Sequence, residues 1–192
     1  MFSITKCLKK SPNSVQTRQF WGWVTMMFNR VDSSRIRKHG ADRVCAEWLL
    51  RNGACVKFVG EQNLFCDYNF LPPDTIPFTR KIKEIYAKEA GINSNGFNHL
   101  RGLTSVDSVH IENCVYVDNG VFSNLMHVKE TLKTLEVIDC QNISDAGLLD
   151  VKNLVNLRKF VAHNLAYVKD EKKVKEELAK ALPHCELDIK VK

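Results

Sequence analysis

The side chains best suited to chemistry in this 192-residue chain are histidines and acidic residues in its C-terminal half. His110, Glu112 and Glu136 combine an imidazole that titrates near neutral pH with two carboxylates. Such a set can exchange protons, bind a cation or recognise a charged partner. Glu136 is distant from the other two in sequence, so the set exists only if the fold brings neighbouring segments into register.

Sequence motifs of common catalytic sites are absent. The chain has no GxxxxGK[ST] or GxGxxG phosphate loop, no GxSxG nucleophile elbow and no HExxH metal motif. None of the seven cysteines forms a CxxC pair, which excludes zinc-ribbon and thioredoxin-type motifs. We therefore expect a protein that is not an enzyme.

An internal repeat determines the expected fold. Apolar residues recur at a period of about 25 residues. The matching positions in successive copies are Ile82, Ile85, Ala87, Ala90; Val106, Val109, Ile111, Cys114; Leu132, Leu135, Val137, Cys140; Leu157, Phe160, Ala162, Leu165; and Leu182, Cys185, Leu187, Ile189. This pattern predicts an α/β leucine-rich repeat solenoid in which each unit supplies one short parallel strand and returns through a short helix. We expect Cys114 and Cys140 to be equivalent core residues.

The repeat also predicts which side chains share the concave face of the sheet. Parallel strands lie about 4.8 Å apart, so equivalent positions form rows. One predicted row is Tyr86, His110, Glu136, Val161 and Glu186, and the next is Lys88, Glu112, Ile138, His163 and Asp188. Three interpretations stay open: a recognition surface for a protein partner (Tyr86, His110, Glu112, Glu136, His163), an ordinary solvated sheet face, or a metal site.

The N-terminus has the composition of a mitochondrial transit peptide. Residues 1–19 hold Lys6, Lys9, Lys10 and Arg18 without an acidic residue, and so carry four of the six net positive charges. The remainder is close to neutral, which gives no electrostatic basis for nucleic-acid binding. An ordinary basic tail is the alternative. No apolar run approaches the roughly 20 residues that a bilayer span needs.

Residues 20–80 lack the repeat and are expected to form an N-terminal helical cap on the domain 81–192. Helical spacing and stop signals predict helices from Phe20 to Val31, from Asp32 or Ser33 to Gly40 and from Ala41 to Arg51, then a strand over 54–59 and a loop over 71–77. The cap would cover the open edge of the solenoid. Trp21 and Trp23 either pack in this cap or dock on a membrane or partner. In a reducing matrix, we expect free thiols.

Three motifs resemble those of a known family. F-W-G-W at 20–23, E-W-L-L-R-x-G-A at 47–54 and D-Y-N at 67–69 are similar to the mitochondrial ATP synthase subunit s family, also called coupling factor B or distal membrane arm assembly component 2-like. The resemblance runs from Phe20 to the C-terminus. It implies a peripheral protein on the matrix side of the inner membrane, which supports proton conduction coupled to ATP synthesis through non-catalytic contacts with the membrane sector or stalk of ATP synthase.

The same resemblance implies a magnesium ion where the cap meets the first repeat. In the family a glycine and a threonine hold it; Gly53 matches the glycine, whereas Lys88 stands near the threonine position. A ligand at Lys88 would have to be a main-chain oxygen, the type of donor that hard cations accept. Two other functions stay open: an assembly factor for the membrane arm of respiratory complex I, and a leucine-rich repeat substrate adaptor.

Overall fold

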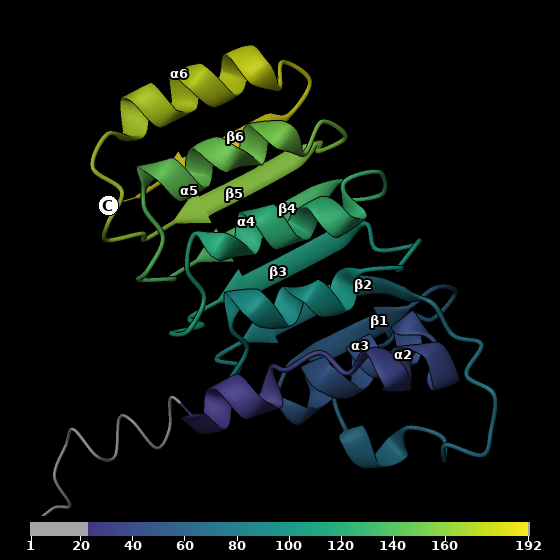
Figure 1. Cartoon of the computed structure of the whole chain (residues 1–192). Helices are drawn as coiled ribbons and strands as arrows, with labels where there is room; N and C mark the ends of the chain where they lie inside the picture. The colour runs from purple at the N-terminus through teal and green to yellow at the C-terminus, as the bar shows by residue number, and fades with distance from the viewer. Residues whose placement is uncertain (1–22, 192) are drawn as a thin grey trace, which may run out of the picture.

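Six short strands form one sheet in the computed structural model, which describes residues 23–191 (Figure 1). The strands are β1 Cys55–Phe58, β2 Ile82–Lys88, β3 Ser108–Glu112, β4 Thr134–Ile138, β5 Lys159–His163 and β6 Glu186–Lys190. Their order in the sheet equals their order along the chain. β1 is antiparallel to β2, and all other neighbours are parallel. The fold is therefore α/β with a mainly parallel sheet, as the repeat predicts.

Helices cover one face of this sheet (Figure 1). They are a helix over 23–28, α2 Ser33–His39, α3 Ala41–Arg51, α4 Gly120–Leu125, α5 Asp145–Asp150 and α6 Glu171–Ala181, with 3₁₀ helices η1 Tyr68–Phe70, η2 Ser94–Leu100, η3 Met126–Val128 and η4 Val151–Asn153. Every second strand residue points under these helices, so apolar side chains fill the space between the layers. Within residues 23–191, no helix combines the length and apolarity that a membrane span requires.

The same turn follows each of the four strands β2 to β5. Its first residue is Glu89, Asn113, Asp139 or Asn164, each with φ between +50° and +53°. Each of these N–H groups donates to the last residue of the next strand, at 2.8 to 3.1 Å. Asn and Asp tolerate this left-handed conformation better than most residues, which explains their repeated use. Cys114 and Cys140 follow directly and are fully buried, so their predicted core role is confirmed.

The predicted register is confirmed for four strands and wrong for the last. Tyr86 lies opposite His110, which in turn lies opposite Glu136, as the repeat predicts. Val161, however, pairs with Asp188 instead of Glu186. The two extra residues lie between α6 and β6: β5 begins two residues after Leu157, whereas β6 begins four residues after the equivalent Leu182. A shift of two keeps the same side chains on each face.

α2 and α3 begin and end where their signals predict, whereas the helix over 23–28 ends three residues before the predicted end at Val31. Asp32 accepts the N–H groups of Ser34 and Arg35 at 2.9 and 3.1 Å and so caps α2. α3 ends at Arg51, and Gly53 follows with φ +82°. The cap is not a purely helical cover, because β1 joins the sheet as its edge strand. Residues 1–19 lie outside the described residues.

One pair of cysteines is bonded, so the prediction of free thiols throughout is wrong. Cys55 and Cys66 form a disulfide. The segment after β1 folds back, and Val56 and Phe65 pair across the outer edge of that strand. This pairing places the two neighbouring cysteines side by side. The free cysteines among residues 23–191 are Cys45, Cys114, Cys140 and Cys185.

Candidate functional site

The sheet face opposite the helices carries the predicted polar row, and His110 lies at its centre. His110 Nδ1 is 3.0 Å from Glu136 Oε2, and its Nε2 is 3.2 Å from Glu112 Oε2. The Tyr86 ring lies beside the imidazole, with centroids 6.0 Å apart. Both imidazole nitrogens can donate to these carboxylates only when the ring carries both protons. The structure therefore brings together four of the five predicted recognition residues.

Two lysines extend this group into a line of polar side chains across the four strands β2 to β5. Lys88 Nζ is 2.8 Å from Glu112, and Lys159 Nζ is 3.0 Å from Glu136. The hydrogen bonds from Lys88 and His110 hold the pKa of Glu112 below its usual range. Partial burial opposes ionisation of Glu136, but hydrogen bonds from His110 and Lys159 outweigh it and lower the pKa of that carboxyl. The resulting polar row, Lys88–Glu112–His110–Glu136–Lys159, pairs each carboxylate with a lysine, so these charges largely cancel.

Tyr86 is held in place by a neighbour on its own strand. Its hydroxyl donates to Glu84 Oε2 at 2.6 Å, and Glu84 in turn pairs with Lys57 at 3.1 Å. The bond to Glu84, together with partial burial, raises the pKa of Tyr86 to about 12. A neutral, oriented phenol is suited to a contact surface and not to proton transfer.

His163 belongs to a separate cluster. Its Nε2 is 3.0 Å from Asp188, which also pairs with Lys190 at 2.9 Å. The apolar side chains of Ile138 and Val161 share this face between the cluster and His110. The fifth predicted recognition residue is therefore on the same face as the other four but not in contact with them.

A metal ion has little support on this face. Within the described residues, no group of three or more His, Cys, Asp or Glu side chains could hold a metal. The nitrogens of His110 each face a different carboxylate, so the three groups satisfy one another instead of converging on an empty centre. The arrangement is one of ion pairs.

The magnesium ion implied by the resemblance also finds no side-chain ligands. Gly53 lies two residues before Cys55 of β1, and Lys88 lies two residues after Tyr86, the partner of Cys55 in β2. Glycine has no side chain, and the Lys88 ammonium is a cation paired with Glu112. Only main-chain oxygens remain at these positions, and carboxylates are the usual protein ligands of magnesium. The side chains do not fit the ion, and its presence stays a prediction.

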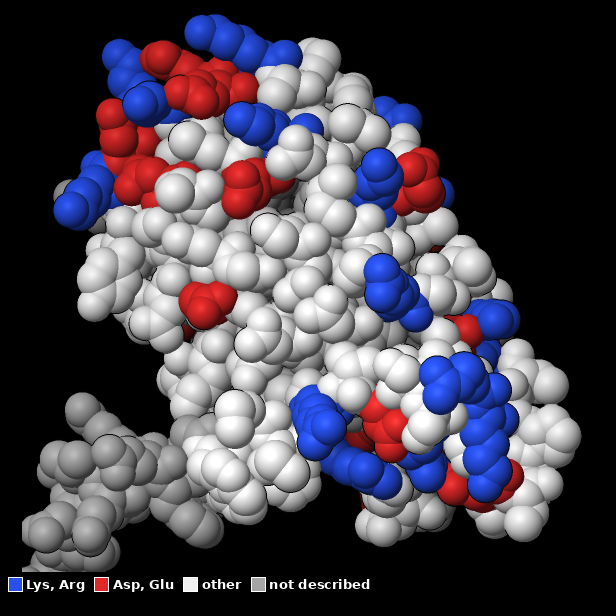
Figure 2. Space-filling model, viewed as in Figure 1, with Lys and Arg blue, Asp and Glu red and all other residues white. Residues whose placement is uncertain are grey.

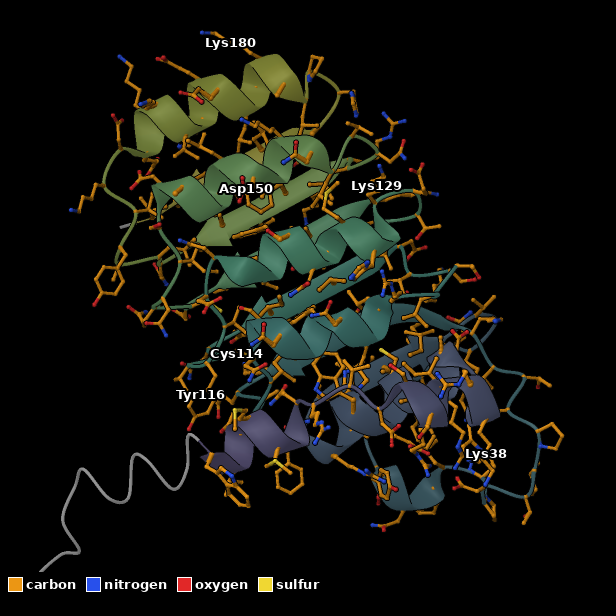
Figure 3. The ribbon with its side chains drawn as sticks, viewed as in Figure 1. Lys38, Cys114, Tyr116, Lys129, Asp150 and Lys180 are labelled. Atoms are coloured by element: carbon orange, nitrogen blue, oxygen red, sulfur yellow. A yellow bond between two sulfur atoms is a disulfide. The ribbon has the colours of Figure 1, made fainter. Side chains whose placement is uncertain are left out.

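The helix over 23–28 is an exposed apolar surface. Trp23, Met26, Met27 and Phe28 are 56%, 59%, 46% and 56% exposed. Trp23 therefore does not pack in the core; Trp21 lies outside the described residues. Figure 3 shows this helix beside Tyr116, at the turn after β3, and the two border a cleft of about 640 Å³.

Asn29 attaches that helix to α3 and to the segment after β2, a role that the sequence does not signal. It is 2% exposed. Its Oδ1 accepts from the Trp48 indole N–H at 2.9 Å and from the Asn93 N–H at 3.0 Å. Its Nδ2 donates to the Thr25 and Gly91 carbonyl oxygens at 2.8 and 3.0 Å. An asparagine after an apolar helix suggests only a helix end, so nothing local identifies these partners.

A second missed group links α3 to the proline-containing loop over 71–77. Glu47 is 2% exposed and pairs with Arg35 and Arg43, at 2.7 and 2.9 Å. Both arginines also reach Asp74 in the loop, at 3.2 and 2.8 Å. The spacing of Arg43 and Glu47 in α3 indicates a pair, but only the fold shows that Asp74 joins it.

Charge is unevenly distributed on the side that carries the helices. Figure 2 shows Lys, Arg, Asp and Glu gathered over α6 and around α2, while the surface over α4 between them has few charges. Together with the opposite face, the described chain offers two contrasting surfaces. One is the polar row on the sheet, and the other is the apolar helix over 23–28.

Comparison with known proteins gives consistent relatives along nearly the whole chain. No family model matches it. The protein named "ATP synthase subunit s, mitochondrial" from Bos taurus is 38% identical over 189 residues, covering 96% of this chain and 94% of the bovine protein. The protein of the same name from Homo sapiens is 37% identical with the same coverage. That from Mus musculus is 36% identical over 188 residues, again covering 96% and 94%.

Proposed function

Because this chain belongs to the mitochondrial ATP synthase subunit s family, we propose that it is a non-catalytic mitochondrial protein that associates with ATP synthase. The observation that carries this proposal is the identity of 38% across 96% of the chain and 94% of a relative with that name. Similarity at this level over the full length supports the same fold and the same class of partner.

The finer architecture proposed is a leucine-rich repeat solenoid. Five parallel-paired strands in chain order support it, as does the turn that recurs after β2, β3, β4 and β5. In such folds the strands line an extended concave surface that is used for binding. A contact function follows from this architecture.

The contact surface that we propose is the polar row on the sheet. Its two lysines and two carboxylates are held by contacts with one another and with His110, so the row is already organised before a partner arrives. Partly buried charge pairs of this kind contribute mainly to specificity, since a partner with mismatched charges is rejected. The partner would be a subunit of the membrane sector or stalk of ATP synthase, contacted on the matrix side, where the protein supports proton conduction.

The exposed helix over 23–28 is proposed to touch the inner membrane at its surface. Tryptophan, methionine and phenylalanine side chains suit the interface between headgroups and acyl chains. Arg30 and Arg37, which border the cleft next to Met26 and Met27, would face anionic headgroups. The contact is peripheral in this proposal.

Magnesium has no role in this proposal. Titration of the full-length chain with magnesium chloride in a calorimeter tests the point directly. A one-to-one isotherm at micromolar ion would mean that main-chain oxygens near Gly53 bind the ion without side-chain help.

The test of the main proposal is native electrophoresis of detergent-solubilised mitochondria that lack the endogenous protein and carry a re-introduced version. We expect the wild-type chain to co-migrate with assembled ATP synthase and to restore oligomycin-sensitive proton flux. Glu136→Lys puts a cation in place of the carboxylate that contacts His110 and Lys159, and it should abolish both the co-migration and the restored flux. The matched control is Glu130→Lys, the same change at a side chain that is 76% exposed and pairs with Lys129 and with no member of the polar row.

Three results would contradict the proposal. Unchanged proton flux in mitochondria without the protein would remove the coupling role. Equal co-migration of the Glu136 and Glu130 variants would remove the polar row as the contact. Migration with sub-complexes of the complex I membrane arm would instead identify an assembly factor.

A further inference from the structure

The only disulfide among the described residues fastens a short segment onto the outer edge of the sheet. Residues 59–66, the flap, leave β1 and fold back over it. Val56 and Phe65 exchange two main-chain hydrogen bonds, of 2.9 and 2.7 Å. Cys55 and Cys66 adjoin this pair, and their bond closes the flap at its end.

Few other contacts hold the end of the flap. The Phe65 ring packs edge-on against Phe58 with centroids 5.8 Å apart, and the Arg80 guanidinium lies over both rings. Residues 62–64 are exposed, and Leu64 is 47% exposed. The half-exposed Glu61 pairs with Arg80 at 3.0 Å. One hydrogen-bonded pair, one ring contact and a partly exposed ion pair are a weak anchor for a segment at the edge of a sheet. The covalent bond therefore decides how firmly the flap is closed.

Thiol chemistry in the described chain is concentrated at this bond. Cys66 is exposed and Cys55 is half-buried, so a reductant can reach the sulfur atoms from solvent. The remaining thiols are protected: burial raises the pKa of Cys45 and Cys114, that of Cys140 to about 12 and that of Cys185 to about 11. Thiolate is the reactive form, so these four react slowly near neutral pH.

We propose that Cys55 and Cys66 form a reversible redox site that closes the flap over β1 when oxidised and releases it when reduced by a dithiol. This inference goes beyond the association with ATP synthase and does not depend on it. Release changes one edge of the sheet from covered to open, because the main-chain groups of Val56 lose their partners in Phe65.

The exchange is balanced by the dithiol itself. One thiolate of the reductant attacks the exposed Cys66 sulfur, the protein S–S bond breaks, and Cys55 leaves as a thiolate that takes up a proton. The second thiol of the reductant, as thiolate, then displaces Cys66. The products are two protein thiols and the disulfide of the reductant, which has given up two electrons. A low-molecular-weight disulfide such as oxidised glutathione reverses the reaction.

Alkylation followed by mass spectrometry tests the redox site on the full-length chain. The chain is treated with oxidised glutathione, denatured and alkylated; we expect five adducts, and seven after dithiothreitol treatment under native conditions, with Cys55 and Cys66 the two that change. Seven adducts without dithiothreitol would overturn the proposal. So would a bond that dithiothreitol cuts only in denaturant, because the disulfide would then be a permanent brace.

Hydrogen exchange tests the release of the flap. Removing a cross-link that closes a loop of about this length should accelerate exchange of the Val56 and Phe65 amides on the order of 100-fold. The amides of Asn113 and Asp139, in turns between other strands, serve as internal references and should not change. Unaltered exchange at Val56 and Phe65 in the reduced chain would refute the release.

Matched variants distinguish the effect of losing the disulfide from any other effect of dithiothreitol. Cys66→Ser should show the fast exchange without dithiothreitol, and Cys185→Ser should retain the slow exchange of the oxidised wild type. If Cys66→Ser folds poorly, the reduced wild-type chain provides the same test without a substitution. Slow exchange in both Cys66→Ser and the reduced wild type would show that the bond does not control the flap.

Discussion

Replacing Asn29 with alanine should detach the helix over 23–28 and destabilise the fold. The substitution leaves the indole N–H of Trp48, the N–H of Asn93 and the carbonyl of Gly91 without their partner in a site where Asn29 is 2% exposed. The bond to Thr25 lies within the helix itself and counts for less.

The magnitude follows from the three groups left behind. A buried donor or acceptor without a partner costs about 1–3 kcal/mol. Clefts border both sides of the helix, so water can reach part of the site and reduce this cost. We therefore expect a loss of about 3 kcal/mol in the free energy of unfolding, near the lower end of the summed range.

Urea denaturation followed by indole fluorescence measures the loss, and hydrogen exchange at residues 25–29 shows whether the helix detaches first. The control is Asn153→Ala, which removes an exposed asparagine with a single 3.0 Å bond to the Asp150 carbonyl and should change stability by about 0.5 kcal/mol or less. The reasoning about Asn29 is refuted if Asn29→Ala is as stable as the Asn153 control and its N-terminal amides exchange no faster.

Three further predictions concern the same end of the molecule. Gly96→Ala would place a Cβ 2.4 Å from Asn29 Oδ1, so we expect a loss of about 2 kcal/mol by thermal denaturation, and a variant as stable as wild type would contradict the close approach. Burial lowers the pKa of His99 despite its bond to a backbone carbonyl. The unfolded chain then binds the proton more readily, so the stability that neutral His99 contributes is complete above the unfolded pKa of about 6.5 and is lost as the pH falls. His99→Gln should therefore flatten the decline in urea midpoint between pH 7 and 5. An unchanged slope would contradict this assignment to His99. Arg43→Met leaves Glu47 with one of its two cations and should cost about 3 kcal/mol in urea denaturation, whereas adding Glu47→Leu should recover part of it; a double variant no more stable than the single one would be inconsistent with this account.

The repeated part of the fold is predictable from the sequence because each strand uses the same local rule. The apolar positions of one copy predict those of the next, and this spacing alone is enough to predict that His110 lies beside Glu136. The failure at β6 has the same origin. Leu182 keeps the 25-residue spacing, but two extra residues follow it, and the alternating apolar residues Cys185, Leu187 and Ile189 fit either register.

The unrepeated part is less predictable because its contacts join segments without a shared pattern. Cys55 and Cys66 become neighbours only when residues 59–66 fold back, and nothing in their spacing distinguishes them from the other cysteines. Trp23 has the apolar character of a core residue, yet Trp48 occupies the buried position next to Asn29. Which tryptophan is buried and which cysteines meet depend on contacts between distant segments of the folded chain.

The identity of strand order and chain order has a kinetic consequence. Each strand from β2 onward adds beside the one made just before it, and the sheet requires no segment to wait for a distant partner. The entropy lost on closing loops during folding is then divided into small, similar steps, and the contact order is low for a parallel sheet. A chain that emerges N-terminus first from a narrow channel could build this sheet one strand at a time, each finished strand serving as the template for the next.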